Sequence, residues 1–206
     1  MYWPLAGALA FLPHMVAILL ATSRRPGFDH AKQYLSELGE RGSETAALMN
    51  FVGIIPTGLL IAVFGFGLLR AYRSEPRLVA AGSLIAVHGI CRVAAGLFPC
   101  DLGCRPAFPS MSQSIHNTSA AIGYVSLTTA VFFAGAWLLA KRRGAFVIAA
   151  TYGLGVCAVA ALLMLFFNLG GQLGLYQRFA LLALQLWVAL FALHFIIHPP
   201  ERHRDA

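Results

Sequence analysis

Long apolar stretches alternate with short polar ones along the chain, and each apolar stretch is long enough to cross a membrane as a helix. A spanning helix needs about 20 mostly apolar residues. Six stretches meet that length: 3–22, 47–70, 78–98, 114–140, 145–168 and 175–198. The pattern predicts an all-α integral membrane bundle of six transmembrane helices, with residues 1–206 forming a single transmembrane domain.

The first long connection has a helical pattern of its own. Phe28, Ala31, Leu35 and Leu38 recur at spacings of three or four residues, with polar residues on the other faces. Asp29 suits the start of a helix, and a glycine follows Leu38 as a stop. We therefore expect a short interfacial helix over 29–38, lying on the membrane surface.

Composition excludes a water-soluble domain. Apolar residues make up 59% of the chain and charged residues 11%, against about 25% charged residues in soluble domains. The net charge of +7 comes from basic residues between the apolar stretches, which favours membrane lipids as partners rather than nucleic acid. The first apolar stretch is followed, not preceded, by Arg24 and Arg25, so we expect it to be kept rather than cleaved as a signal peptide. The oligomeric state stays open.

The distribution of basic residues favours a topology with both termini in the cytoplasm. That orientation puts most of them on the cytoplasmic side, namely Arg70, Arg73, Arg77, Lys141, Arg142, Arg143, Arg202 and Arg204. Arg24 and Arg25 in the first connection oppose it. The third connection then faces outward, where Cys100 and Cys104 could form a disulfide or remain two free thiols.

Small residues predict where the helices approach each other most closely. The second span carries Gly53, Gly58, Gly65 and Gly67, and the fifth carries Ala149, Gly153, Cys157 and Ala161 at four-residue spacing. Small side chains allow membrane helices to pack closely. We therefore expect both sets to face neighbouring helices.

The third span contains two costly polar residues, His88 and Arg92, which lie four residues apart and share a helix face. An arginine at this depth costs about 2.5–3.5 kcal/mol on insertion scales, so it should face the bundle and find a partner. Two interpretations stay open. The pair forms a structural hydrogen-bond cluster, or it contacts an anion or lipid headgroup inside a cavity.

Candidate chemistry lies in the connections on one side of the predicted bundle. Asp101 and His116 flank the third connection, and Asp29, His30 and Glu37 lie in the first. A carboxylate that orients a histidine makes a general base, and the same groups could hold a divalent metal such as zinc. Isolated loop carboxylates are also ordinary helix caps. The cofactor stays unknown, with Asp101 and His116 as the candidate ligands of a divalent metal. Haem is not expected, because His88 and His194 lie at poorly matched depths, although His14 is a further candidate ligand.

Several of these residues stand in motifs that resemble the DUF998 family of membrane proteins. The motifs are Pro26-Gly-Phe-Asp-His30, Gln33-Tyr-Leu-Ser-Glu-Leu-Gly39, Asn50, Leu97-Phe-Pro-Cys-Asp101, Cys104 and Ile115-His-Asn117. The resemblance implies a bacterial-type membrane protein, hence the inner membrane, with no settled activity. It marks as signature positions Asp29, Ser36, Glu37, Asn50, Asp101, His116 and Asn117.

Two functions follow as hypotheses. In the first, the chain is a hydrolase or transferase that acts on a lipid or lipid-linked substrate at the outer face. Asp101 and His116 would form its acid–base or metal pair, assisted by Glu37. Substrate would be bound by Asp29, Asn50, His88, Arg92 and Asn117. In the second, the same residues serve a non-enzymatic transporter, lipid-binding protein or accessory protein.

Overall fold

The computed structural model describes residues 2–199. Within that range it contains helices, joined by turns and loops, and no strand. Six helical segments are long and apolar enough to cross a membrane, which confirms the predicted fold class. They are α1 (Trp3–Leu9) with α2 (Phe11–Ser23), the π-helix η2 (Leu48–Ile54) with α3 (Ile55–Ala71), α4 (Pro76–Leu97), α5 (Met111–Ala140), α6 (Ala145–Phe166) and α7 (Leu173–Ile197). The fourth span starts at Met111, earlier than expected, because Ser110 caps it by accepting a hydrogen bond from the Gln113 amide.

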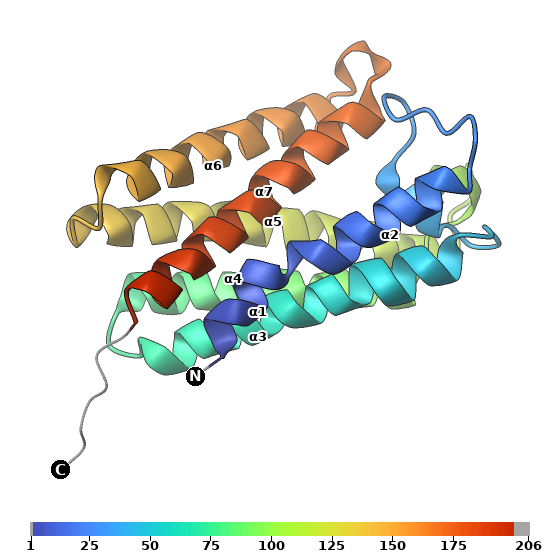
Figure 1. Cartoon of the computed structure of the whole chain (residues 1–206). Coiled ribbons are helices and arrows are strands. Elements are labelled where there is room, and N and C mark those ends of the chain that lie inside the picture. Colours follow the sequence, from blue (N-terminus) through green and yellow to red (C-terminus); the bar gives the residue numbers. More distant parts are fainter. Residues whose placement is uncertain (1, 200–206) are drawn as a thin grey trace.

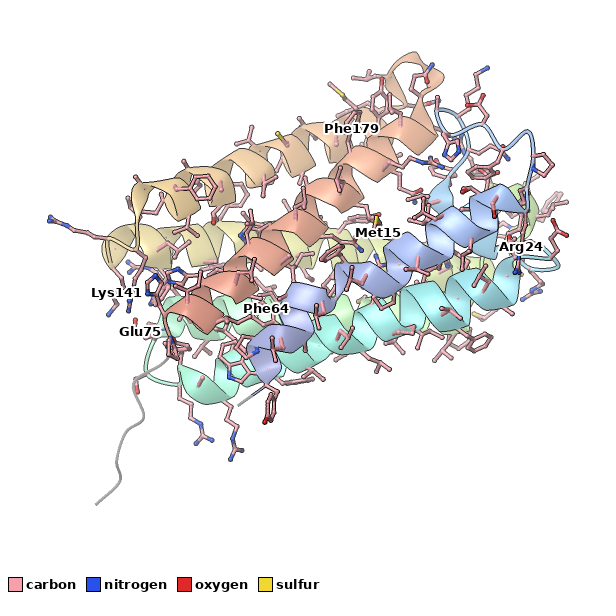
Figure 2. All side chains as sticks on the ribbon, viewed as in Figure 1. Met15, Arg24, Phe64, Glu75, Lys141 and Phe179 are labelled. Atoms are coloured by element: carbon pink, nitrogen blue, oxygen red, sulfur yellow. A yellow bond between two sulfur atoms is a disulfide. The ribbon has the colours of Figure 1, made fainter. Side chains whose placement is uncertain are left out.

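The bundle has two distinct ends, which Figure 1 shows at opposite sides of the view. At one, the terminal end, α1 begins, α7 ends, and short turns connect α3 to α4 and α5 to α6. At the other, the loop end, lie the two long connections and the turn from α6 to α7. Figure 2 labels Glu75 and Lys141 together at the terminal end, where they form an ion pair of 2.6 Å, and Arg24 at the loop end. Arg202 and Arg204 lie outside the described residues.

The first span is broken in its middle. Pro13 has no amide hydrogen for the Leu9 carbonyl, so the helical ladder is interrupted and α1 gives way to α2 at Ala10. The break places His14 early in α2, where it is buried with 2% of its surface exposed. A polar side chain therefore enters the bundle interior at this depth.

The closest helix contact joins α3 and α4 through glycines on both helices. A Cβ added to Gly65 would lie 2.5 Å from the Ala86 nitrogen, and one added to Gly89 would lie 2.5 Å from the Ala62 nitrogen. The predicted packing role of the second span's glycines is confirmed. The prediction for the fifth span was wrong for Ala149, Gly153 and Cys157, which are exposed, and right for Ala161, which is buried. The α6 glycine that packs on α5 is Gly155, against Val131.

The helix expected on the membrane surface over 29–38 is shorter and packs inside the bundle. Asp29 bonds its own backbone, accepting from the amides of Ala31 and Lys32 in a tight turn. Only the 3-10 helix η1 (Leu35–Gly39) follows, and Leu35 and Leu38 are buried against α2 and the π-helix. Short side chain–backbone bonds thus replace the first helical turn, and the apolar side chains face protein rather than lipid.

Candidate functional site

The first long connection is held to the bundle by a polar network that includes Glu37. The Glu37 carboxylate accepts from the Tyr34 amide at 2.8 Å and from the Gln33 side chain at 2.7 Å, which closes η1 as a capping box. The Leu35 amide donates to the Gln177 side chain on α7 at 2.7 Å. Glu37 therefore fixes the conformation of the loop, and both of its carboxylate oxygens are used in doing so.

The two long connections meet directly at the loop end. The Arg41 amide donates to the Cys100 carbonyl at 2.8 Å, and the Gly103 amide donates to the Glu40 carboxylate at 2.6 Å. Glu40 is buried and also pairs with Arg25 at 3.2 Å. In the third connection Cys100 and Cys104 are joined as a disulfide, with their Cα atoms 5.0 Å apart. The two loops thus form one cover over the loop end.

Asp101 stabilises this cover rather than contacting His116. Its carboxylate accepts from the Ser110 amide at 2.9 Å and from the Ser110 hydroxyl at 2.7 Å, and Arg41 lies 3.9 Å away. The Ser110 donors, and then the Arg41 charge, hold the pKa of Asp101 below its usual range. The carboxylate therefore stabilises the fold at neutral pH, and this contribution is lost as the pH falls through the lowered pKa.

His116 presents one ring nitrogen to the interior of the site. Its Nδ1 lies 2.9 Å from the Ala95 carbonyl and 3.1 Å from the Phe98 carbonyl. Because carbonyl oxygens only accept hydrogen bonds, Nδ1 must carry the hydrogen, and Nε2 of the neutral ring keeps its lone pair. His116 therefore has the orientation of a fixed base or hydrogen-bond acceptor.

A second polar cluster lies deeper, where α2, α4, α5 and α7 meet. The Nδ1 of His14 accepts from Arg92 at 3.1 Å and from the Gln185 amide at 3.2 Å. The Nδ1 of His88 lies 2.8 Å from the Gly123 carbonyl, so it donates there. His88 and Arg92 are thus both bonded across helices, as expected for polar groups at membrane depth.

These side chains surround an inner cavity of about 60 Å³. The polar side chains in its lining are His14, Ser36, His88, Arg92, His116, Ser119, Tyr124 and Gln177. None of the residues that line it within 2–199 is acidic. The cavity therefore contains basic and neutral groups, and no group of three or more metal-ligating side chains is found in the described part of the chain.

A much larger groove of about 890 Å³ runs beside the cavity, between α5 and α6. Its wall along α5 and α6 is mostly apolar and includes Val125, Leu162, Leu163 and Phe166, with Thr128 and Thr129 among them. Val125 is 65% exposed and Phe166 is 81% exposed, so the groove is open at the side of the bundle. At the loop end its lining becomes polar, with Tyr34, Arg105, Gln113 and Asn117.

The groove and the inner cavity share part of their lining. Ser36, His116, Ala120, Tyr124 and Gln177 contribute to both. The two spaces therefore lie against each other, with His116 between them. One molecule could place an apolar portion in the groove and a polar end toward the cavity.

The structure brings together only some of the residues expected to form a site. Arg92, His88 and His116 line the cavity, and Asn117 lines the groove, where its side-chain oxygen accepts from Gln113 at 2.8 Å. Among residues 2–199, no hydrogen bond joins Asp101 to His116, and neither Asp101 nor Glu37 lines either space. The acid–histidine pair and its metal therefore stay a prediction that no contact supports.

Two further expected binding residues lie away from both spaces. Asp29 caps its turn at the surface, and the donors from Ala31 and Lys32 lower the pKa of its carboxyl. Asn50 is buried and donates to the Gly39 carbonyl at 2.8 Å, which fixes the end of η1 against the π-helix. Both residues shape the loop and do not line the site.

Several site residues were missed from the sequence. Tyr124, Gln177 and Gln185 are polar residues within predicted spans, and the sequence suggested His14 only as a possible haem ligand. A signal for them existed, because a polar side chain at membrane depth normally faces the bundle and pairs there. Ser36 was marked only as a signature position, and its place in the lining depends on how the loop folds back.

Comparison with known proteins gives a family and no activity. The family described as "Protein of unknown function (DUF998)" matches residues 5–194, which is nearly the whole chain. No curated protein and no solved structure matches the chain. The match covers all six spans and both long connections.

Proposed function

We propose that this chain, which belongs to the DUF998 family, takes an amphiphilic lipid from one leaflet of the membrane into the groove between α5 and α6. The hydrocarbon portion would lie along the apolar wall, and the polar end would reach His116 and the inner cavity. The chain is an integral membrane protein, so a lipid can enter the open side of the groove without leaving the membrane.

The observation that carries the proposal is the shared lining of the two spaces. The groove volume of about 890 Å³ lies within the range of about 300–1,000 Å³ typical of ligand sites. Its apolar wall suits hydrocarbon, and four of the five residues common to groove and cavity, Ser36, His116, Tyr124 and Gln177, are polar. The lining of the site therefore changes from apolar to polar, which matches the hydrocarbon portion and the polar end of an amphiphilic lipid.

The proposal also places the loop end outside the cytoplasm of a bacterial inner membrane, with both termini inside. Basic side chains at the terminal end, such as Arg73 and Lys141, support this orientation. The disulfide between Cys100 and Cys104 at the loop end fits an oxidising compartment. The lipid would then come from the outer leaflet.

A side chain that fills the groove tests lipid binding. Ala121 lines the groove and is exposed within it, so Ala121→Trp should exclude the hydrocarbon portion. We expect native mass spectrometry of the protein released from mild detergent to show bound lipid on the wild type. The variant should retain at least tenfold less.

The matched control is Ile122→Trp, one residue along α5. Ile122 is 49% exposed and does not line the groove, so this variant should keep its lipid. Equal lipid retention by both variants would show that the lipid lies elsewhere on the bundle, and the proposal would then fail.

A catalytic role, as a hydrolase or transferase, is the second candidate. It is favoured by His116, whose Nε2 keeps a lone pair, and by Ser36, which lines both spaces and makes no side-chain hydrogen bond within residues 2–199. His116 could take the proton of water, or of the Ser36 hydroxyl, as that oxygen attacks an ester carbon of the lipid. The ester bond would then break, and His116 would return the proton to the alcohol oxygen that leaves. In this case Asp101 would stabilise the conformation of the third connection and would not contact the substrate.

Substitution of His116 separates catalysis from binding. If His116 is a general base, His116→Ala should lower turnover of a membrane-lipid extract by about 10²–10⁴-fold, because such bases contribute that much to rate. Bound lipid should remain. Products would be followed by mass spectrometry, with Asp101→Asn as the comparison. If Asp101→Asn alone stops turnover in a stably folded protein, the acid–histidine pair is favoured instead.

A further inference from the structure

Arg92 is a positive charge inside the bundle without a negative partner. The four ion pairs found among residues 2–199 all lie near the two ends, and none of them includes Arg92. Its Nη2 donates to His14, while its Nε is buried and has no hydrogen-bond partner. Guanidinium has five donors, and a buried donor left unpaired destabilises the protein. The free protein therefore leaves this group incompletely satisfied.

The surrounding side chains cannot supply the missing charge. His14 accepts through Nδ1 from both Arg92 and Gln185, so it is neutral. Ser36, Ser119 and Tyr124 add hydroxyl groups to the cavity lining. All of these groups are uncharged or donors, so a ligand that completes the site should bring the negative charge.

The dimensions of the inner cavity limit that ligand. A water needs about 10–15 Å³ on this measure, so about 60 Å³ holds roughly four to six waters. That space suits one carboxylate or phosphate group and is too small for a sugar. The cavity also adjoins the groove through His116 and Tyr124, where the polar end of a bound lipid would arrive.

From these observations we infer that Arg92 binds a single oxyanion, a phosphate or carboxylate, at the polar end of the lipid held in the groove. The inference rests on the proposed lipid-binding function and adds the charge of the ligand. Arginine is suited to the role because its planar fork donates two parallel hydrogen bonds to one oxyanion. A neutral lipid of the same chain length would leave the guanidinium unpaired.

The test compares four probes on the purified protein in a neutral detergent. Dioctanoyl phosphatidic acid carries the oxyanion and the chains, dioctanoylglycerol carries only the chains, octanoate carries a carboxylate on one chain, and inorganic phosphate carries only the oxyanion. Apparent affinity is measured from the shift in unfolding midpoint over ligand concentration. We expect phosphatidic acid or octanoate to bind at least tenfold more tightly than dioctanoylglycerol, and inorganic phosphate to bind far more weakly.

Variants then assign the preference to Arg92. Arg92→Met should remove the preference for the anionic lipid while binding of dioctanoylglycerol persists, and Arg92→Lys should keep part of it. Arg73→Met removes the same charge from the exposed surface at the terminal end, so it should keep the full preference. If Arg92→Met does not fold, Arg92→Lys and the wild-type probes still decide the question.

The possible failures are distinct from one another. Equal binding of anionic and neutral lipids, or a preference that survives Arg92→Met, would overturn the oxyanion site and leave the lipid groove standing. Protection by inorganic phosphate equal to that by phosphatidic acid would overturn the assignment to a lipid headgroup. Absence of binding by every lipid would contradict the proposed function itself.

Discussion

Replacing Gly65 by isoleucine is expected to prevent stable packing of α3 against α4. A Cβ at this position would lie 2.5 Å from the Ala86 nitrogen and 2.8 Å from the Gly82 carbonyl oxygen, both of which are backbone atoms. Overpacking typically costs about 1–3 kcal/mol. Because a helix backbone cannot move aside as a side chain can, we expect the upper end of that range, about 3 kcal/mol.

The matched control for Gly65→Ile is Gly153→Ile on α6. Gly153 is also inside an apolar helix, and a Cβ there would have nothing within 4 Å. Both variants replace glycine by isoleucine within a helix, so the change in helix propensity is the same. The difference in stability between them therefore measures the effect of packing. Unfolding followed by circular dichroism against the mole fraction of sodium dodecyl sulfate should show a large loss of stability at Gly65 and little change at Gly153. Equal effects would contradict the glycine-mediated contact.

Removing the Glu40 carboxylate is expected to open the loop cover. Glu40 Oε1 pairs with Arg25 and Oε2 accepts from the Gly103 amide, so one buried side chain ties the first connection to the third. Removing one partner of a buried ion pair costs about 3–5 kcal/mol. The Arg25 side chain is 25% exposed and also donates to the Glu37 carbonyl, so we expect about 2 kcal/mol for Glu40→Ala.

Trypsin reports this opening at Arg41 in the first connection, which is followed by glycine. A loss of about 2 kcal/mol in local stability should increase cleavage there more than tenfold. Glu44→Ala is the control, since Glu44 is exposed and makes no side-chain hydrogen bond within the described residues. Unchanged cleavage in Glu40→Ala would mean that the two loops are held together by other contacts.

The sequence predicts the six spans well because the thickness of the hydrocarbon core fixes how long each apolar stretch must be. It does not predict which face of a lipid-embedded helix packs. On α6 the residues Ala149, Gly153 and Cys157 face outward, and Gly155 faces α5. Apolar side chains suit lipid and protein equally, so periodicity carries little information about burial in a membrane.

The candidate site was predicted in part, for a related reason. His88 and Arg92 stand out because polar residues in an apolar span are costly. The hydrogen bonds from Arg92 and Gln185 to His14 depend on how three helices pack against one another. The spacing of residues along a single helix does not predict that packing. Asp101 was expected to pair with His116, but Ser110 provides nearer donors within the same connection. The Asp101 carboxylate, which the sequence suggested as a catalytic group, is thus occupied by hydrogen bonds to Ser110.

The central claim is that the groove and the inner cavity form one site for a single amphiphile, and mapping of a photoreactive lipid tests it most directly. One lipid carries the photoreactive group at its polar end and another carries it at the tip of a chain. The account predicts that the polar-end probe labels the segments around Ser36, His116 and Tyr124. The chain-tip probe should label the part of the groove farther from the loop end, around Thr128 on α5 and Val159 on α6. Labelling by both probes spread over the outer surfaces of the bundle, with none around His116, would contradict it.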